Sequence, residues 1–362
     1  AKSTGGAPAT QAVTGVGFTP SVVIFWASGG TVSNTWIDTF SQTFGAATPT
    51  EQFAHARYGV DNTTGVGAFY MGGAASNALQ FITSSVVAQA SLASMDSDGF
   101  TLTWTTNNAT AYLIHYMALG GTQITGKDIS TLSLPASLGD KVVTGVGFQP
   151  QLILTSRGST SAPASLFADR DIGAGDGTSQ WSAGDSTFWY DPDLKMYSFG
   201  TRSSSKLLLF PFNATTPGIE ATLKSLDSDG YTVNFTAISF STAWKALTLK
   251  GCHFKVGSFT KSVTGAPTDQ AVTGVGFTPK GLLLITSGQN SEGIRDYVGT
   301  KMQIGASDGT NHATTCNQST NAATPTNVAA VGSSTKVLIA AQNITQTVTS
   351  QCVVKSFNSD GF

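Results

Sequence analysis

The hexapeptide Val13-Thr-Gly-Val-Gly-Phe18 occurs twice more without change, at Val143–Phe148 and at Val272–Phe277. The copies begin about 130 residues apart, a period too long for a solenoid and typical of whole domains in tandem. A second phrase follows each copy at a near-constant distance, at Asp96–Phe100, Asp227–Tyr231 and Asn358–Phe362 (Asp/Asn-Ser-Asp-Gly-Phe/Tyr). Two markers in the same order predict one type of domain used three times.

Strand patterns dominate each repeat. A short apolar run follows every Gly-Phe-x-Pro, at Ser21–Ala27, Gln151–Thr155 and Gly281–Thr286. Such runs, bounded by Gly or Pro and rich in branched residues, indicate buried strands. The Ser-Asp-Gly turn leads into segments that alternate apolar with Thr or Asn, which is typical of half-buried antiparallel strands.

We therefore predict an all-β protein of three tandem antiparallel β-sandwich domains, jelly-roll-like, at 1–122, 123–254 and 255–362. The segment Asn34–Phe44 is the one place where we expect a helical turn. The third repeat stops about 20 residues earlier than the other two. Because this omission exposes a sheet edge, we expect either that the polypeptide continues past Phe362 or that another chain supplies two strands.

The composition excludes several classes of protein. Charged residues are 11% of the chain, the net charge is −2, and no Lys/Arg run occurs, which argues against nucleic-acid binding. No apolar run approaches the length of a membrane span, and because no apolar h-region of a signal peptide follows Ala1–Thr4, we expect a protein that is not exported. The three cysteines, Cys252, Cys316 and Cys352, have no metal-ligand spacing; Cys316 and Cys352 share a repeat, but we interpret all three as free thiols.

Residue patterns for catalysis are weak. Gly305-Ala-Ser307-Asp-Gly309 matches a nucleophile elbow, but no helix-like segment follows it, and we interpret it as a turn. The histidines do not recur at equivalent positions: His55, His115, His253 and His312. No repeat shows the paired carboxylates that a polysaccharide hydrolase needs, so we predict a protein that is not an enzyme and uses no cofactor.

Calcium binding is a weaker candidate function. The Asp-Ser-Asp-Gly phrases resemble the start of an EF-hand loop, but the terminal Glu of that loop is absent, and we interpret them as β-turns. A second carboxylate-rich segment, Asp169–Gly177, has candidate ligands at Asp169, Asp171 and Asp176; we interpret it as a solvated Gly-rich loop and predict no metal site.

Aromatic residues are the candidate binding residues. Trp26 and Trp104 fall on strands and are expected in the core. A glycan or a partner protein is expected to contact aromatics in less regular segments, namely Trp36, Trp181, Trp189 and Tyr190.

The two repeated phrases resemble a widespread module of tailed-bacteriophage virion proteins. In that module Gly-Phe-x-Pro and an apolar strand open a β-sandwich, and Ser-Asp-Gly-Phe precedes its last strands. The resemblance covers all three repeats, although only the second keeps the Arg-containing stretch that members carry after the first strand, at Ser156-Arg157-Gly158. It implies a virion protein made in the host cytoplasm, with other capsid or tail proteins as partners.

The resulting expectation is a non-enzymatic structural protein, either an exterior capsid decoration (cement) protein or a tail or fibre protein. Repetition multiplies weak contacts, and exposed strand edges favour a symmetric homo-oligomer, such as a trimer. The alternative is a glycan-binding adhesin or receptor-binding protein on a phage or bacterial surface, with a host-surface glycan as its partner. A hydrolase is the third class.

Overall fold

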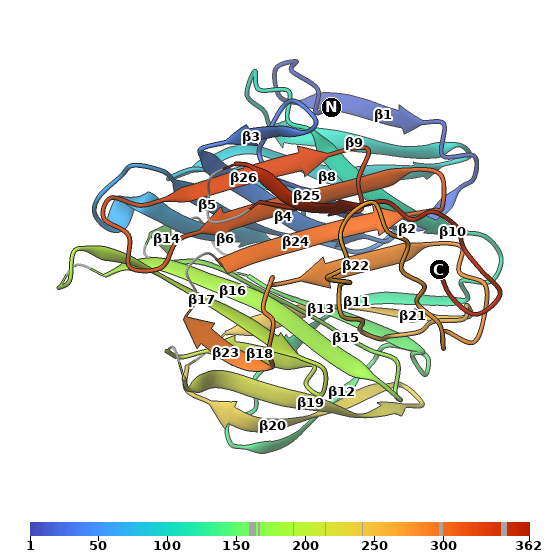
Figure 1. Ribbon diagram of the computed structural model, residues 1–362. Helices are drawn as coiled ribbons and strands as arrows, with labels where there is room; N and C mark the ends of the chain where they lie inside the picture. Colours follow the sequence, from blue (N-terminus) through green and yellow to red (C-terminus); the bar gives the residue numbers. More distant parts are fainter. Residues whose placement is uncertain are drawn as a thin grey trace.

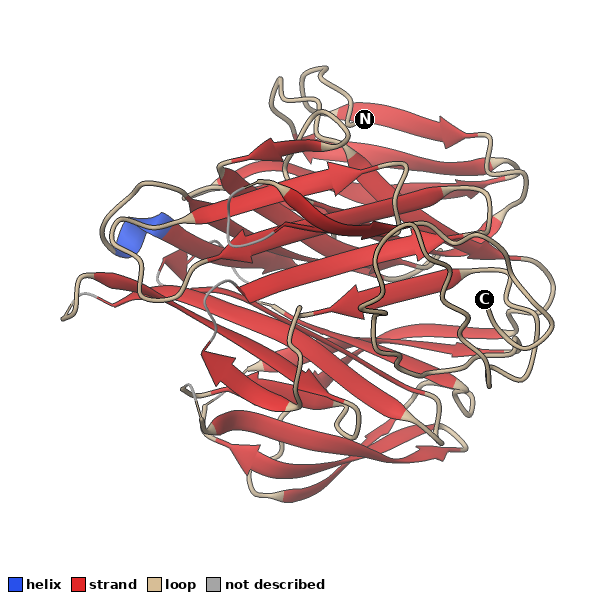
Figure 2. Cartoon of the chain, viewed as in Figure 1, coloured by secondary structure: helices blue, strands red, loops and turns tan. Residues whose placement is uncertain are grey.

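The regular secondary structure of the described residues is almost entirely antiparallel strand, joined by loops (Figure 2). The computed structural model describes residues 1–158, 164–165, 167–190, 192–213, 215–240, 242–296, 300–341 and 346–362. Within these residues the one helical element is the 3₁₀ turn η1 (Val66–Ala68). The predicted all-β, multi-sandwich class is confirmed.

The first repeat forms a two-layer sandwich, at the top of Figure 1. Its strands are β1 (Ala9–Thr14), β2 (Pro20–Ala27), β3 (Thr35–Ile37), β4 (Thr39–Ala47), β5 (Gln52–Val60), β6 (Phe69–Ala74), β7 (Leu79–Ile82), β8 (Val86–Asp96), β9 (Gly99–Thr106) and β10 (Ile114–Gly120). The outer sheet has the order β1-β9-β8-β7 and the inner sheet β10-β2-β4-β5-β6. Trp104, Phe100 and Phe25 lie in the core between the two sheets.

The second repeat has the same plan, at the bottom of Figure 1. Its strands are β11 (Gly126–Ser133), β12 (Gly139–Thr144), β13 (Leu152–Arg157), β14 (Ala164–Ser165), β15 (Phe167–Gly175), β16 (Gln180–Tyr190), β17 (Lys195–Ser203), β18 (Leu208–Pro211), β19 (Pro217–Asp227), β20 (Gly230–Ile238) and β21 (Ala243–Lys250). The outer sheet is β12-β20-β19-β18, and the inner sheet is β11-β21-β13-β15-β16-β17.

The third repeat, drawn in orange and red, lies between the other two in Figure 1. Its strands are β22 (Leu282–Thr286), β23 (Gly293–Asp296), β24 (Thr300–Ser307), β25 (His312–Ser319), β26 (Val328–Ser333), β27 (Leu338–Ala341) and β28 (Val348–Cys352). The inner sheet is β22-β24-β25-β26, and the outer layer is the β27-β28 pair.

Each repeat contributes one short strand to the inner sheet of another repeat. β14 of the second repeat pairs with β6 of the first, β23 of the third pairs with β17 of the second, and β3 of the first pairs with β26 of the third. Each inner sheet is therefore extended by its neighbour, and the exchange closes into a ring rather than running along a row.

A buried triad marks the centre of this ring. Arg57, Asp185 and Asn317 lie on β5, β16 and β25, each at the same interval after a matched glycine on the preceding strand. Arg57 donates to Asp185 over 2.6 Å and to Asn317 over 2.8 Å, and Asn317 donates to Asp185 over 3.2 Å. Three equivalent positions can meet at one point only on a shared axis. The repeats are therefore arranged with pseudo-threefold symmetry.

Apolar and hydroxyl side chains fill the space around the axis. One cluster combines Trp26 and Phe44 of the first repeat with Ile172 and Leu247 of the second and Ile304 of the third. Nearby, the hydroxyl groups of Thr187, Ser198 and Ser319 lie within 3.2 Å of one another. The inner strands are thus buried on both faces, and many of their Ser and Thr side chains lie inside.

The two repeated phrases contact each other directly. The carboxylate of Asp98 accepts the backbone N–H groups of Gly15 and Gly17, at 2.9 and 2.7 Å. The same pair of bonds recurs at Asp229 and at Asp360. These bonds explain why both phrases recur together, since each is half of one turn-to-turn clamp. They also lower the pKa of all three carboxyl groups.

One detail of the sequence-based expectation is corrected. Asn34–Phe44 contains no helical turn; it forms β3 and the start of β4, because the neighbouring sheets pair with both segments. Within each complete sandwich, three consecutive strands of a sheet are neighbours (β4-β5-β6 and β7-β8-β9), and the last strand returns to the inner sheet, where β10 lies beside β2 and β21 beside β13. The three cysteines are free, as expected.

Candidate functional site

The four predicted binding aromatics occupy different environments. Trp36 on β3 packs against the small core of the third repeat, and Trp181 is half-buried against the central core. Trp189 is 3% exposed in a cluster to which all three repeats contribute. Tyr190 is 47% exposed. Of the four, only Tyr190 presents a largely open ring, and the expected surface role of Trp189 is contradicted by its burial.

Tyr190 belongs to a group of five aromatic rings on β15, β16 and β17, which we call the aromatic ladder: Phe167, Phe188, Tyr190, Tyr197 and Phe199. The ring of Phe188 lies 5.7 Å from Phe167, 5.9 Å from Tyr197 and 5.8 Å from Phe199, and Tyr190 lies 6.1 Å from Tyr197. Phe167 is 43% exposed. The ladder therefore runs from a covered end at Phe199 to an open end at Phe167 and Tyr190.

Strand geometry explains this arrangement. Successive side chains of a strand point to opposite faces, so Phe188 and Tyr190 share one face of β16 while Trp189 points to the other. Phe167, Phe188 and Tyr197 are cross-strand partners in register. The Phe-x-Tyr spacing was the signal in the sequence that would have found Phe188, which the prediction from irregular segments missed.

The ladder is specific to the second repeat because its hairpin is longer. β16 and β17 have 11 and 9 residues, whereas the matching strands of the first repeat, β5 and β6, have 9 and 6. In Figure 1 this hairpin reaches the left edge of the molecule, beyond the outer sheet. At its tip the hydroxyl of Tyr197 donates to Asp193, a hydrogen bond that raises the pKa of Tyr197.

A buried ionic group lies on the same face of β15 and β16 as the ladder. Arg157 forms a salt bridge of 3.0 Å with Asp169, which also accepts a 2.6 Å hydrogen bond from Ser186. The guanidinium of Arg157 lies 3.8 Å from the centre of the Phe210 ring. Burial raises the pKa of Asp169, and Arg157 opposes this effect. Asp169 and Ser186 lie two residues from Phe167 and Phe188 on the same strands, and the side chains of Arg157 and Asp169 are 7% and 4% exposed.

The three calcium candidates do not form a metal site. Asp169 and Asp171 lie on β15 and not on a solvated loop, and both are buried. Burial raises the pKa of Asp171 to about 8, and Trp244 donates to it. Asp176 accepts three backbone N–H groups, from Thr178, Ser179 and Val256. In the part of the chain that the structure describes, no group of three or more His, Cys, Asp or Glu side chains is placed to hold a metal ion.

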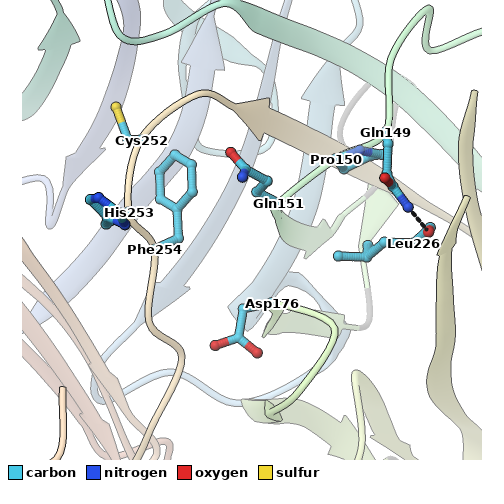
Figure 3. A pocket seen from close by; sticks show the side chains of 8 residues that line it. All are labelled: Gln149, Pro150, Gln151, Asp176, Leu226, Cys252, His253 and Phe254. Carbon is cyan, nitrogen blue, oxygen red and sulfur yellow. Dashed lines mark hydrogen bonds between the residues drawn. The ribbon is translucent and has the colours of Figure 1, made fainter. Parts of the chain in front are cut away.

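A hollow of about 330 Å³ lies where the second repeat leads into the third (Figure 3). Its lining residues are Gln149, Pro150, Gln151, Asp176, Leu226, Cys252, His253 and Phe254. The Cys–His sequence suggests nucleophilic chemistry, but burial raises the pKa of Cys252, which disfavours the reactive thiolate. His253 instead lies 5.7 Å from the Phe277 ring, so we interpret the hollow as a seam between repeats.

A second hollow, of about 310 Å³, contains two glutamates, Glu220 and Glu292. Glu220 pairs with Lys206 at 2.7 Å, and Glu292 pairs with Arg202 at 3.3 Å. Burial raises the pKa of Glu220, but hydrogen bonds from Lys206 and Thr236 outweigh it and the net shift is downward. A carboxyl group with a lowered pKa is a poor general acid, so Glu220 does not suit the acid role in a glycosidase.

The Ser–His contacts are structural in character. Ser307 bonds His312 at 2.9 Å across the ends of β24 and β25, and the oxygens of Asp308 accept N–H groups of the same turn. His55 bonds Ser156 at 3.0 Å, but His55 is buried and desolvation lowers its pKa to about 3. Desolvation also lowers the pKa of buried His115, to about 4. Neither His55 nor His115 is tuned to accept a proton near neutral pH.

Comparison of the chain with known protein families, with characterised proteins and with solved structures finds no match. Within the described residues no helix is long and apolar enough to cross a bilayer. The argument about function therefore depends on the repeats, their arrangement and the aromatic ladder.

Proposed function

We propose that this chain is a non-enzymatic structural component of a bacteriophage virion, either an exterior capsid decoration or cement protein or a tail or fibre protein. The observation that carries the proposal is the closed ring of three related sandwiches. Such a ring presents related surfaces three times around one axis, so that several weak contacts with a symmetric partner add in avidity.

Two further observations support a structural role. The axis is occupied by a buried ion pair and by packed side chains, which suits a rigid block and leaves the centre of the ring filled. In the second hollow the pKa of Glu220 is lowered, and in the first hollow burial raises the pKa of the Cys252 thiol, as described above. The module that the repeated phrases resemble belongs to virion proteins as well.

The proposal is tested on virions of the phage whose genome carries this gene. Mass spectrometry of gradient-purified particles should detect the chain, and antibody labelling in electron microscopy should place it on the outside of the capsid or tail. Absence from purified particles, with the protein present only in the soluble fraction of infected cells, would refute the proposal.

The aromatic ladder favours a second candidate function, binding of a glycan on the host surface. Partly exposed rings of Phe167 and Tyr190 provide apolar faces on which a sugar ring can stack, and the polar groups of Tyr197 and Asp193 adjoin them. The aromatic ladder occurs only in the second repeat of the described residues. In this function the ladder would bind the host glycan, and the ring of three sandwiches would attach the protein to the virion.

The glycan-binding candidate is tested with the purified protein and host surface polysaccharide. The double variant Phe167→Ala/Tyr190→Ala should lose binding by about tenfold or more, since stacking contacts contribute about 1 kcal/mol each. Phe212→Ala removes another exposed aromatic of the same repeat, 62% exposed and outside the ladder, and should leave binding unchanged. Equal affinities of the wild type and the double variant would exclude the ladder as the site.

A further inference from the structure

Arg170 on β15 is a buried cation at the contact between the first and second repeats, and its exposed fraction is 1%. Its Nη2 donates over 3.3 Å to the backbone carbonyl oxygen of His55 on β5, and its guanidinium lies 6.0 Å from the centre of the Phe44 ring. Its Nε and Nη1 have no hydrogen-bond acceptor among the described residues. Because Nη1 carries two N–H groups and Nε carries one, a permanent cation keeps three buried donors without an acceptor.

The carboxylate of Asp185 does not neutralise Arg170, although the two residues are cross-strand partners on β15 and β16. Its Oδ1 accepts a hydrogen bond of 2.6 Å from Arg57, and its Oδ2 accepts one of 3.2 Å from Asn317. Burial and the charge of Arg57 lower the pKa of Arg170, whereas Asp185 raises it. No salt bridge between described residues includes Arg170. One carboxylate thus faces two buried guanidinium groups, which leaves one positive charge uncompensated.

The two other carboxyl groups of β15 lie on the opposite face of the strand. Successive side chains point to opposite faces, so Asp169 and Asp171 are directed away from Arg170. Asp169 is paired with Arg157, and Asp171 accepts a hydrogen bond from Trp244. Neither carboxyl group is therefore placed to compensate the charge of Arg170.

A second buried group near Arg170 has a nitrogen without a partner. Nδ1 of His55 lies 3.0 Å from the hydroxyl of Ser156, and Nε2 has no partner among the described residues. Burial, and then the charge of Arg170, lower the pKa of His55 to about 3, so the ring is neutral at pH 7. When Ser156 donates to Nδ1, the proton of the neutral ring is on Nε2, which adds another N–H donor beside the cation.

The other two repeats have uncharged residues at the position of Arg170. Arg170 lies three residues before Gly173, the matched glycine of its repeat, and Gln42 and Met302 lie at the same interval before theirs. Gln42 and Met302 are also buried, at 1% and 0% exposure. The uncompensated cation is thus specific to the second repeat, and the fold accommodates a neutral side chain at the equivalent positions.

We propose that a single small monovalent anion, a halide such as chloride, is bound beside Arg170 at the contact between the first and second repeats. Water could accept the same N–H groups but would leave the positive charge uncompensated, and an unpaired buried charge is far more costly than a paired one. The full burial of Arg170 restricts the ligand to a small ion. The anion stabilises the closed ring, whether or not the chain is part of a virion.

The whole 362-residue chain is refolded from urea at constant ionic strength, with sodium bromide replacing sodium gluconate in steps. Urea is the denaturant because guanidinium chloride would itself supply a halide. Above the dissociation constant, the folding equilibrium constant of the wild type should rise about tenfold for each tenfold increase in bromide.

Two variants of Arg170 should lose this dependence on bromide. Arg170→Met introduces the residue of the third repeat, and Arg170→Gln introduces that of the first. The matched control is Arg295→Met, which removes an exposed arginine and should keep the dependence of the wild type. An equal effect of bromide on the wild type and on a variant of Arg170 would overturn the proposal, as would a wild type that does not respond to bromide.

A crystal of the wild type grown in bromide locates the ion and decides the matter even where neither variant folds. The anomalous difference map at the bromine edge should show a peak in contact with Nε or Nη1 of Arg170. Ordered water without an anomalous peak at this position, or bromide bound at the surface alone, would overturn the proposal.

Discussion

At the residue scale, steric constraints explain why glycine occupies the last position of each Ser-Asp-Gly turn. Gly99, Gly230 and Gly361 all have φ near +150°, and a Cβ added to them would lie 1.9–2.0 Å from the carbonyl oxygens of Val13, Val143 and Val272. No side chain fits such a space. The glycine lets the second phrase approach the backbone of the first, while the preceding Asp binds the amides there.

Gly230→Ala tests this explanation. We expect the free energy of unfolding to fall by at least about 2 kcal/mol, because the backbone must move to relieve both the clash and the unfavourable φ. Gly257→Ala is the matched control, since nothing lies within 4 Å of its added Cβ. Chemical denaturation should show the control within about 0.5 kcal/mol of the wild type. Equal effects of both substitutions would contradict the steric argument.

The partly buried carboxyl group of Asp128 leads us to predict how the stability of the folded protein depends on pH. Burial and the nearby charge of Glu51 raise its pKa to about 6, against 3.8 for the ordinary carboxyl, and Ser130 opposes the shift. The folded state therefore binds the proton more tightly, and its stability falls as the pH rises from about 4 to above 6.

Asp128→Asn cannot ionise, so the variant should be more stable than the wild type at pH 7–8. Because Asp128 is partly exposed to solvent, we expect a gain of about 1 kcal/mol and not the full value of the shift. Thermal melts from pH 3 to 8 should show the gain disappearing below pH 4. A wild-type advantage at pH 8 would show that the carboxylate is stabilising.

At the scale of elements, the sequence predicts strands that alternate apolar with polar residues and buried strands that are apolar throughout, but not buried strands rich in Ser and Thr. The alternation of Phe100–Trp104 correctly predicts β9, whose polar residues are less buried than its apolar ones. β16 has no such alternation, because buried Ser and Thr occupy positions around the axis. For that reason the sequence did not indicate that Trp189 points inward.

The short strands that pair with a neighbouring repeat could not be predicted from the sequence either. β3, β14 and β23 have three, two and four residues, too few for any periodicity to be recognised. They pair because closure of the ring brings the neighbouring sheet edge to them. Tertiary arrangement, and not local propensity, determines their structure.

The triad that joins β5, β16 and β25 allows a prediction about the free energy of unfolding. Arg57→Leu leaves the carboxylate of Asp185 buried without its nearest cation, and we expect a loss of about 3–5 kcal/mol. The double variant Arg57→Leu/Asp185→Leu removes both charges and should be more stable than the single variant. Chemical denaturation measures both. A single variant within about 1 kcal/mol of the wild type would contradict a buried contact between the two repeats.

At the scale of the molecule, the recurring phrases predicted three sandwiches but not their arrangement. Nothing in the spacing of the phrases distinguishes a row of domains from a ring. The threefold association expected between chains occurs here within one chain, and further association with other copies remains a prediction.

Small-angle X-ray scattering of the chain in solution tests the closed ring most directly. A single compact body of 362 residues should have a radius of gyration of about 21 Å. Three sandwiches in a row would have a value on the order of 30 Å, from the same relation applied to each domain. We predict the smaller value, and the larger one would contradict the ring.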